Sequence, residues 1–387
     1  MGQIHTGATT KGQPRASQAR RGLTQSGIVL VDKPQGITSH DVVARTRKLA
    51  GTRKVGHAGT LDPLATGLLV LGLNNSTRLL TYVVGLDKEY EAVIRLGAAT
   101  TTDDSEGETI FTAPAGAVEA VQPETIAAGL AALTGDILQT PSSVSAIRVD
   151  GKRAYTRVRE GETVVLDARP VTIASIDVSA ATPGTDAEGN AVLDVAARIT
   201  CSTGTYIRAI ARDLGDALGV GGHLTALRRT RIGPFEVAHA HTLDVLDPAR
   251  DLVTPADTAR ALFPAVQLDE IQASELRDGK RIAVDPPPPA PGTEASARGP
   301  IAAIDPDGAL IGLFELRGGL SRVLVNFARD AAPLPATDTA DESVADAPTK
   351  ASDAAIPDAD IPDAETPTMA ADAPAAAATA RTLGASA

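Results

Sequence analysis

The chain has 387 residues, which is long enough for more than one domain, and carries a formal net charge of −12. Its one cysteine, Cys201, excludes an internal disulfide and any cysteine-rich zinc site, and this usage suits a reducing cytoplasm. No apolar run approaches the roughly 20 residues that span a membrane, and residues 1–25 lack the apolar segment of a signal peptide.

The charge is unevenly distributed along the chain. Residues 1–25 contain four bases and no acids, whereas residues 330–387 contain 11 acids and two bases, so residues 26–329 carry the remaining −7. Both ends lack core-forming patterns, and we predict a disordered basic arm over 1–25 and a disordered Ala/Asp/Pro-rich acidic tail over 330–387. The net charge gives no reason to expect a nucleic-acid partner, because only a localised basic surface could bind one.

The first part of the chain is predicted to alternate short strands and helices. Gly27–Asp32 is an apolar strand followed by a turn, and Ser39 is predicted as the N-cap of a helix that stops at Gly51. Three further elements follow: a buried strand at Leu68–Leu71, a short helix capped by Asn75 or Ser76 and ending at Tyr82, and an alternating strand over Lys88–Gly97.

Between these elements, residues 56–67 hold one carboxylate, Asp62, in a turn that contains three glycines and a proline. Glycine permits backbone conformations closed to other residues and proline fixes φ, so such a turn can hold a side chain in one pose. Composition alone favours a plainer interpretation, in which Asp62 caps a backbone N–H where the loop enters a strand.

The second part begins with a helix over Pro123–Leu133, with proline in its first turn and Gly135 beyond its end. Residues 163–200 are predicted as strands interrupted by a polar loop near 183–190, and Thr205 as the cap of an amphipathic helix. From about residue 266 the pattern changes to a short helix over Ala273–Gly279 and four strands, at 282–284, 301–304, 310–316 and 323–327, with a Pro/Ala-rich loop at 285–300.

Residues 56–67, Gly-His-Ala-Gly-Thr-Leu-Asp-Pro-Leu-Ala-Thr-Gly, resemble the catalytic motif of the bacterial tRNA pseudouridine-55 synthases. Residues 32–39, 201–208 and 221–229 resemble further motifs of that family. The resemblance implies an α/β (α+β) fold, with a mixed-sheet catalytic domain over 26–265 and a small β-rich RNA-binding domain of the PUA type over 266–329.

The resemblance assigns roles to six residues. Asp62 would be the nucleophile, Arg208 would pair with it, and Tyr90 would lie against the target base and offer a phenol as proton acceptor. From the sequence alone, Arg208 is as readily a solvated helix arginine, and Tyr206 and Leu227 ordinary core residues. The implied substrate pocket is lined by His57, which fills the space left by the base, and by Tyr90, Tyr206 and Leu227.

Three other segments are expected near the substrate. Gly97–Gly107 resembles a polar loop beside the site, and Gln139–Gly161 resembles a mobile insertion that closes over RNA. The insertion is locally basic, as phosphate contact requires. Its bases are Arg148, Lys152, Arg153, Arg157 and Arg159, and Arg228, Arg229 and Arg231 form a second basic cluster.

Converting uridine to pseudouridine breaks the bond from C1′ to N1 and remakes it to C5, so nothing is oxidised and neither a cofactor nor a metal is required. The reaction needs a carboxylate held away from water, and covalent carboxylate catalysis at a sugar carbon has precedent in retaining glycosidases. Whether Asp62 adds to the ring or to C1′, or assists elimination at the sugar, stays open.

The predicted function is therefore isomerisation of uridine 55 in the T stem-loop of tRNA, with the base flipped out of its stack, in the cytoplasm. Neither a membrane nor an obligatory protein partner is expected. Two alternatives use the same residues: a non-catalytic tRNA-folding chaperone would bind without the nucleophile, and an N-glycosidase would release free uracil.

Overall fold

The computed structural model describes residues 22–142, 148–149, 152–153, 166–287 and 299–328. Several predicted features lie outside these residues: the basic arm except its last four positions, most of the insertion, the middle of the Pro/Ala-rich loop and the acidic tail. Within the described residues no helix is long and apolar enough to cross a membrane.

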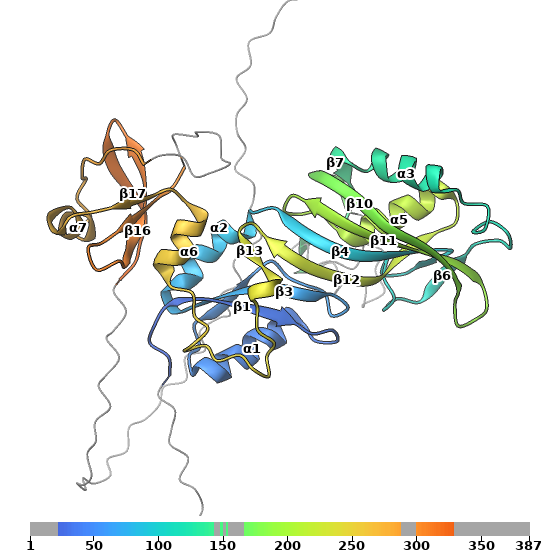
Figure 1. The fold of residues 1–387 in the computed structure, drawn as a ribbon, viewed down its shortest axis with the longest axis horizontal. Coiled ribbons are helices and arrows are strands. Elements are labelled where there is room, and N and C mark those ends of the chain that lie inside the picture. The colour runs from blue at the N-terminus through green and yellow to red at the C-terminus, as the bar shows by residue number, and fades with distance from the viewer. Residues whose placement is uncertain (1–21, 143–147, 150–151, 154–165, 288–298, 329–387) are drawn as a thin grey trace, which may run out of the picture. The chain divides into compact units, whose positions relative to one another are not determined.

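A nine-stranded sheet forms the larger part of the described structure (Figure 1). Its central path runs β1–β3–β12–β4–β11–β10–β7, with β2 paired to β3 and β13 paired to β12. The strands are β1 (Gly27–Lys33), β2 (Val55–Ala58), β3 (Thr66–Leu73), β4 (Lys88–Leu96), β7 (Gly135–Gln139), β10 (Arg169–Thr185), β11 (Ala191–Cys201), β12 (Gly222–Ile232) and β13 (Phe235–Glu236).

Most neighbours in this sheet are antiparallel, but β3 and β12 run parallel, with Arg228 opposite Thr66 and Arg229 opposite Gly67. A parallel pair needs a long crossover, and here the chain forms four other strands of the sheet, β4, β7, β10 and β11, between β3 and β12. The sheet is therefore mixed, which confirms the predicted fold class. β5 (Ala98–Thr100) and β6 (Thr109–Thr112) form a separate hairpin that the sequence analysis missed.

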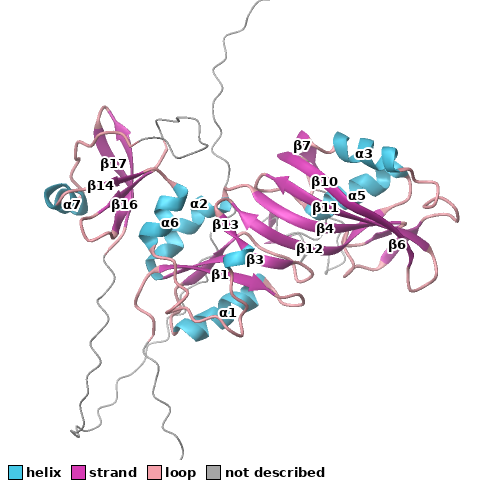
Figure 2. Cartoon of the chain, in the orientation of Figure 1, coloured by secondary structure: helices cyan, strands magenta, loops and turns pink. Residues whose placement is uncertain are grey.

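Helices α3 (Pro123–Ala132) and α5 (Ile207–Leu218) pack on one face of the sheet (Figure 2). The alternation of β4 turns Tyr90, Ala92 and Ile94 into the same hydrophobic cluster as the apolar stripe of α5. Leu61 and Leu64 from the loop between β2 and β3 join this cluster. The loop is thus fixed to the core by its apolar side chains, and its polar side chains are left for other contacts.

The helix starts differ from the predicted caps. Helix α1 (Ser39–Ala50) is capped by Thr38, whose hydroxyl accepts from the Asp41 N–H in a capping box, and Gly51 ends it in the left-handed conformation. Helix α5 begins after Tyr206 rather than Thr205 and has no side-chain cap. The predicted helix near Asn75 is a 3₁₀ turn (Asn74–Leu79) followed by α2 (Leu80–Val84), also without a side-chain cap.

A second sheet, β14–β15–β16–β17, contains the strands predicted near the end of the chain. Its helix α7 (Glu270–Arg277) begins three residues earlier than predicted, because Asp269 and Gln272 form a capping box. The predicted strand at 282–284 is wrong, since the structure has only one isolated bridge there, at Ala283. The strands are β14 (Ala265–Gln267), which was missed, β15 (Ile301–Ile304), β16 (Leu310–Arg317) and β17 (Leu320–Asn326).

This sheet shares a hydrophobic cluster with the segments that precede it. Leu79 packs in that cluster with β15 and β16 residues and with α6 (Pro255–Leu262). The Tyr82 and Phe263 rings meet edge to face, 5.1 Å apart, and Arg78 donates to the Asn326 carbonyl at 2.8 Å. The small sheet is thus tied to the 3₁₀ turn and α2 by buried apolar surface.

Candidate active site

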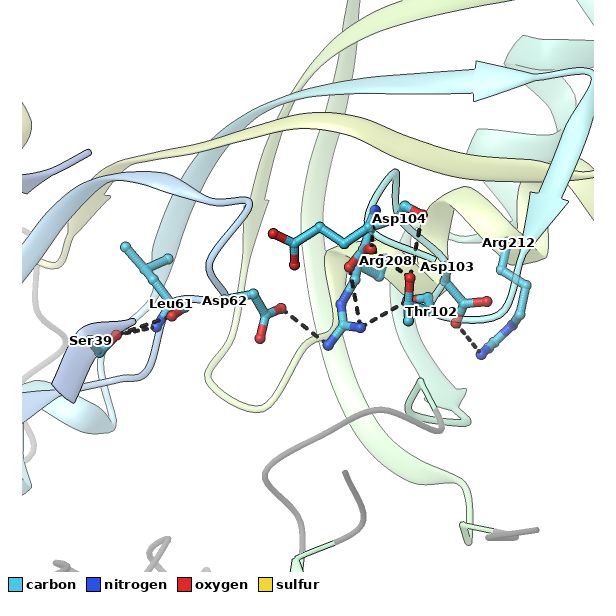
Figure 3. Close-up of polar contacts among 9 residues, drawn as sticks. Ser39, Leu61, Asp62, Thr102, Asp103, Asp104, Arg208 and Arg212 are labelled. Atoms are coloured by element: carbon cyan, nitrogen blue, oxygen red, sulfur yellow. Dashed lines mark hydrogen bonds and ion pairs between the residues drawn. The ribbon is translucent and has the colours of Figure 1, made fainter. Parts of the chain in front are cut away.

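Asp62 lies in the loop between β2 and β3 (Figure 3). This loop approaches β12 at both of its ends, through Gly59 and Gly67. Its backbone carbonyl accepts from the Ala65 N–H at 3.1 Å, closing a turn that contains Pro63. Leu61 and Leu64 are buried on either side of it, 4% exposed each. Because its neighbours face the core, the Asp62 carboxylate is directed out of the loop.

Ser39 fastens the residue before Asp62. Its hydroxyl accepts from the Leu61 N–H at 2.8 Å and donates to the Leu61 carbonyl at 3.1 Å, so one side chain satisfies both backbone groups of one residue. Figure 3 shows this contact on the opposite side of Asp62 from Arg208. Ser39 was expected to cap α1, but its side chain instead fixes the backbone directly before the carboxylate.

Arg208, in the first turn of α5, pairs with Asp62 at 3.1 Å. Its side chain is only 6% exposed, whereas the Asp62 side chain is 43% exposed. The two residues thus meet as the sequence reasoning expected, but the carboxylate is not shielded from solvent by the chain itself. One side of Asp62 is held by a buried cation and the other side is accessible to a substrate.

A second carboxylate, that of Asp104, also pairs with the Arg208 guanidinium. Asp104 Oδ2 lies 3.5 Å from Arg208 Nη1, and the Thr102 carbonyl accepts from Nη1 at 2.8 Å. The Asp104 side chain is 3% exposed and also accepts from the Thr102 hydroxyl at 2.6 Å. Since Arg208 is bound on both sides, its guanidinium has little freedom to turn away from Asp62.

The loop that carries Asp104 is rich in negative charge. Burial raises the pKa of Glu106 above its usual range, and the Asp104 and Asp62 carboxylates add to the effect. Arg212, one turn after Arg208, counters part of this charge by pairing with Asp103 at 3.3 Å and also donates to the Thr140 carbonyl at 2.8 Å. α5 therefore holds the polar loop with two arginines, of which one reaches Asp62.

Tyr90 and Leu227 come from neighbouring strands, β4 and β12, and belong to the cluster that contains Leu61 and Leu64. Tyr90 is 7% exposed and Leu227 is 9% exposed. Burial raises the pKa of the Tyr90 phenol, and the positive charge of Arg229 offsets part of the rise. Tyr90 is therefore a neutral phenol at physiological pH. To accept a proton during the reaction it must first give up its own phenol proton.

His57 and Tyr206 belong to two other segments of the chain. His57 is in β2, opposite Leu71, and its ring meets that of His40 edge to face at 5.7 Å. Tyr206 precedes α5, and the Gln139 amide binds its backbone twice, accepting from the N–H at 2.8 Å and donating to the carbonyl at 3.1 Å. Gln139 thus fixes the start of the helix that carries Arg208.

The predicted cluster of Arg228, Arg229 and Arg231 is not a continuous basic surface. Arg228 makes a bidentate pair with Asp32, at 3.0 and 2.7 Å, and Arg231 pairs with Asp87 at 2.7 Å. Arg229 faces the interior and is 1% exposed, because successive strand residues point to opposite faces. The side chains of the predicted basic insertion lie outside the described residues.

The sequence analysis missed the supporting side chains. Asp104 appeared only as part of a polar loop, Arg229 only as a surface base, and Ser39 only as a cap. Each has its role through a partner far along the chain: Asp104 meets Arg208, Ser39 meets Leu61 and Arg229 meets Gly59. Among the residues that the structure describes, no three His, Cys, Asp or Glu side chains lie close enough together to hold a metal ion.

Three family profiles match consecutive parts of the chain. Residues 47–207 match the N-terminal domain of the TruB family pseudouridylate synthases, residues 208–270 match a tRNA pseudouridylate synthase B C-terminal domain, and residues 263–328 match the C-terminal part of tRNA pseudouridine synthase II. Together these matches cover the large sheet from the end of α1 onward and the small sheet.

Curated proteins named tRNA pseudouridine synthase B match this chain along nearly their whole length. The chain is 57% identical to tRNA pseudouridine synthase B of Leifsonia xyli subsp. xyli over 309 residues, which are 80% of this chain and 99% of the relative. It is 55% identical to the protein of that name from Arthrobacter sp. over 303 residues, 78% of this chain and 97% of the relative.

Solved structures share the fold. A Cbf5-Nop10-Gar1 complex contains a chain with a TM-score of 0.55 and 25% identity, over 79% of this chain and 85% of that one. An H/ACA RNP bound to a substrate RNA containing 2′-deoxyuridine contains one with a TM-score of 0.54 and 25% identity, over 79% and 86%.

Proposed function

Since the chain belongs to the TruB family of pseudouridylate synthases, and is therefore an isomerase that makes pseudouridine in tRNA, we propose that its target is uridine 55 of the T loop and its nucleophile Asp62. The observation that carries the proposal is the 3.1 Å pair between Asp62 and the buried Arg208. An anionic oxygen with one side accessible and the other held by a cation is the arrangement that a carboxylate nucleophile needs.

Arg208 would stabilise the negative charge of Asp62 and aim the carboxylate at the junction of ribose and base. The Coulomb attraction between opposite charges is stronger where water is excluded, and the guanidinium is nearly fully buried. Asp104 would keep the guanidinium in place through the reaction. The 43% exposure of Asp62 is consistent with a site that becomes dry only when RNA covers it.

The uridine would have to leave its stack to reach Asp62. Extrusion costs a few kcal/mol, and stacking on one aromatic side chain returns about 1–3 kcal/mol. Tyr90 would supply that aromatic face and Leu227 the apolar surface beside it, since both line the cluster next to the Asp62 loop. His57 would fill the space that the base leaves in the RNA, and Tyr206 would line the pocket near Arg208.

Two domains would together bind the tRNA. Residues 26–265 would form the catalytic domain and residues 266–329 an RNA-binding domain of the PUA type, with the T stem-loop of tRNA as the ligand of both. RNA of this kind is recognised by loop shape and stacking rather than by a base-edge code. The cytoplasm, where tRNA is available, would be the site of action.

The test uses the full chain with an unmodified tRNA transcript. Asp62→Asn should bind the transcript with a Kd within about threefold of the unsubstituted chain, because charge is lost but shape is kept, and should form no pseudouridine. Modified uridines are mapped by carbodiimide-primed reverse-transcription stops. Asp103→Asn, which breaks a neighbouring pair with Arg212, is the matched control and should retain most activity.

Four outcomes would contradict the proposal. Normal turnover by Asp62→Asn would show that Asp62 is not the nucleophile. A reverse-transcription stop at a uridine other than 55 would show that the target is a different uridine. Free uracil in the supernatant would show an N-glycosidase. A chain that binds tRNA and forms no pseudouridine even with Asp62 intact would instead be a tRNA-folding chaperone.

A further inference from the structure

Arg229 is a fully buried arginine directly beneath the loop that carries Asp62. It is 1% exposed, and its guanidinium donates from Nε to the Leu68 carbonyl at 2.8 Å and from Nη2 to the Gly59 carbonyl at 3.0 Å. No carboxylate of the described residues lies within ion-pair distance of it. Burying a charge costs several kcal/mol unless it is well compensated, so a neutral apolar side chain would be the less costly occupant of this place.

The loop rests on Arg229 at both of its ends. A Cβ atom on Gly59 would lie 3.3 Å from Arg229 Nη1, and one on Gly67 would lie 2.2 Å from the Arg229 carbonyl oxygen. Both glycines have positive φ, +77° and +98°, which other residues rarely adopt. The backbone before Asp62 therefore contacts the guanidinium, and the backbone after it contacts the main chain of the same residue.

Arg229 is also a neighbour of Tyr90 in the sheet. The antiparallel register of β4 and β12 sets Arg229 opposite Tyr90, so both side chains leave the same face of the sheet. The positive charge of Arg229 acts on the phenol, since it offsets part of the rise that burial causes in the pKa of Tyr90. One side chain thus contacts the Asp62 loop and lies opposite the residue that would stack on the target base.

We propose that Arg229 is a positioning residue for the isomerisation, which fixes the Asp62 loop and the Tyr90 phenol relative to each other. A lysine could not replace it, because a single ammonium on a flexible stem cannot span the Gly59 and Leu68 carbonyls as the planar guanidinium does. The proposal rests on the proposed function, since it needs Asp62 and Tyr90 to act on one uridine. The proposal does not require Arg229 to contact RNA.

The experiment compares Arg229→Lys with Arg228→Lys in the full chain. Arg228 is the adjacent residue of the same strand but pairs with Asp32 on the opposite face, so it controls for loss of an arginine from β12. Single-turnover rates at saturating tRNA transcript and Kd by filter binding are measured separately. Arg229→Lys should lower the rate about tenfold or more and leave the Kd within about threefold, whereas Arg228→Lys should leave the rate within about twofold.

A double-substitution cycle with Tyr90→Phe measures the coupling between Arg229 and the phenol in the single-turnover rate. A merely structural role of Arg229 would give no such coupling. If Arg229 acts through the phenol, Arg229→Lys should cost the rate less in the Tyr90→Phe background than in the unsubstituted chain. Equal costs in both backgrounds, a normal rate for Arg229→Lys, or a loss confined to Kd would each overturn the proposal. Pseudouridine formation by the unsubstituted chain is measured alongside, so failure of the proposed function is recognised separately.

Should Arg229→Lys fail to fold, Gly59→Ala approaches the same guanidinium from the loop. Its Cβ would lie 3.3 Å from Nη1, so the guanidinium must shift slightly, and alanine at the Gly59 φ of +77° also strains the backbone of the loop. We expect the rate to fall with tRNA binding retained. A folded Gly59→Ala protein with the rate of the unsubstituted chain would count against the proposal.

Discussion

At the scale of single residues, the Asp62 loop is bordered by a further buried cation, Lys33, whose ammonium lies 3.4 Å from the Pro63 carbonyl oxygen. Lys33 has no exposed surface, and its ammonium donates to the Ile37 carbonyl at 2.7 Å and to the Pro34 carbonyl at 3.0 Å. Burial lowers the pKa of Lys33 from 10.5 to about 8, although the nearby Asp62 carboxylate acts in the opposite direction. Lys33 therefore makes stability depend on pH above neutrality.

The direction follows from proton binding. Between pH 8 and 10.5 the unfolded chain keeps the Lys33 proton while the folded chain loses it, so the free energy of unfolding rises with pH across this window. Relative to Lys33→Met, which has no such titration, the unsubstituted chain should gain about 2 kcal/mol between pH 7.5 and 10. Urea unfolding at the two pH values measures the gain.

An exposed lysine supplies the control for this measurement. Lys280 is 59% exposed, so Lys280→Met removes a lysine ammonium that folding does not bury, and its unfolding is measured over the same range for comparison. A flat or falling difference for Lys33→Met would show that the buried ammonium does not titrate as described.

Residue roles were predictable where a local motif specifies them. Asp62 and Arg208 could be named because each stands in a contiguous stretch, and the structure places them 3.1 Å apart; their catalytic roles stay predictions. Ser39 could not be assigned correctly, because a serine at a helix start has the same sequence signature whether it caps the helix or reaches Leu61, 22 residues away. Asp104 and Arg229 were missed for the same reason.

At the scale of elements, the close parallel pairing of β3 and β12 leaves no room for a side chain at Gly67. A Cβ there would lie 2.2 Å from the Arg229 carbonyl oxygen and 2.8 Å from its nitrogen, both rigid backbone atoms. Gly36 also has positive φ, +84°, but a Cβ on Gly36 would have no neighbouring atom within 4 Å. Comparing an alanine substitution at Gly36 with one at Gly67 therefore separates the cost of backbone strain from the cost of steric exclusion.

Gly36→Ala should cost about 1–2 kcal/mol of unfolding free energy, the cost of an alanine in the left-handed region. Gly67→Ala carries the same strain and in addition must push two strands apart, so it should cost at least about 2 kcal/mol more. Denaturant unfolding of both variants measures the difference. Equal losses would mean that the strands separate easily and that their close contact is not essential.

Elements with a strong pattern were predicted well and short ones were not. The strand at 301–304 has the predicted bounds, and β4 and α3 agree within one residue. β2 was missed because Val55–Ala58 contains a glycine and a histidine and is too short to show alternation. The strand expected at 282–284 fails because an apolar triplet does not reveal whether a neighbouring strand will pair with it.

At the scale of the whole molecule, net charge is a poor guide to the substrate. The chain carries −12, yet many of its arginines are bound to carboxylates, as Arg95 is to Asp194 at 2.7 Å and Arg198 is to Glu91 at 3.3 Å. Such pairs neutralise charge of both signs locally. This is why composition did not suggest RNA and why a motif was needed to predict it.

Binding of tRNA should nevertheless weaken steeply with salt, because phosphate contacts release counterions whatever the net charge of the protein. We expect the Kd to rise by at least about tenfold between 50 and 200 mM salt, measured by filter binding. Asp62→Asn should show the same dependence, since Asp62 contacts no phosphate in the proposed complex. A Kd that does not change with salt would contradict backbone recognition of the RNA.

The parallel contact between β3 and β12 also has a consequence for how the protein is made. Thr66 and Arg228 are neighbours in the sheet but are separated by 162 residues along the chain. At a synthesis rate of about 5–20 residues per second, the ribosome delivers Arg229 about 10–30 s after Asp62. Throughout that interval the nascent chain exposes the glycine-rich loop without the strand that supports it, so competence for catalysis is acquired late, after β12 has left the exit tunnel and joined the sheet.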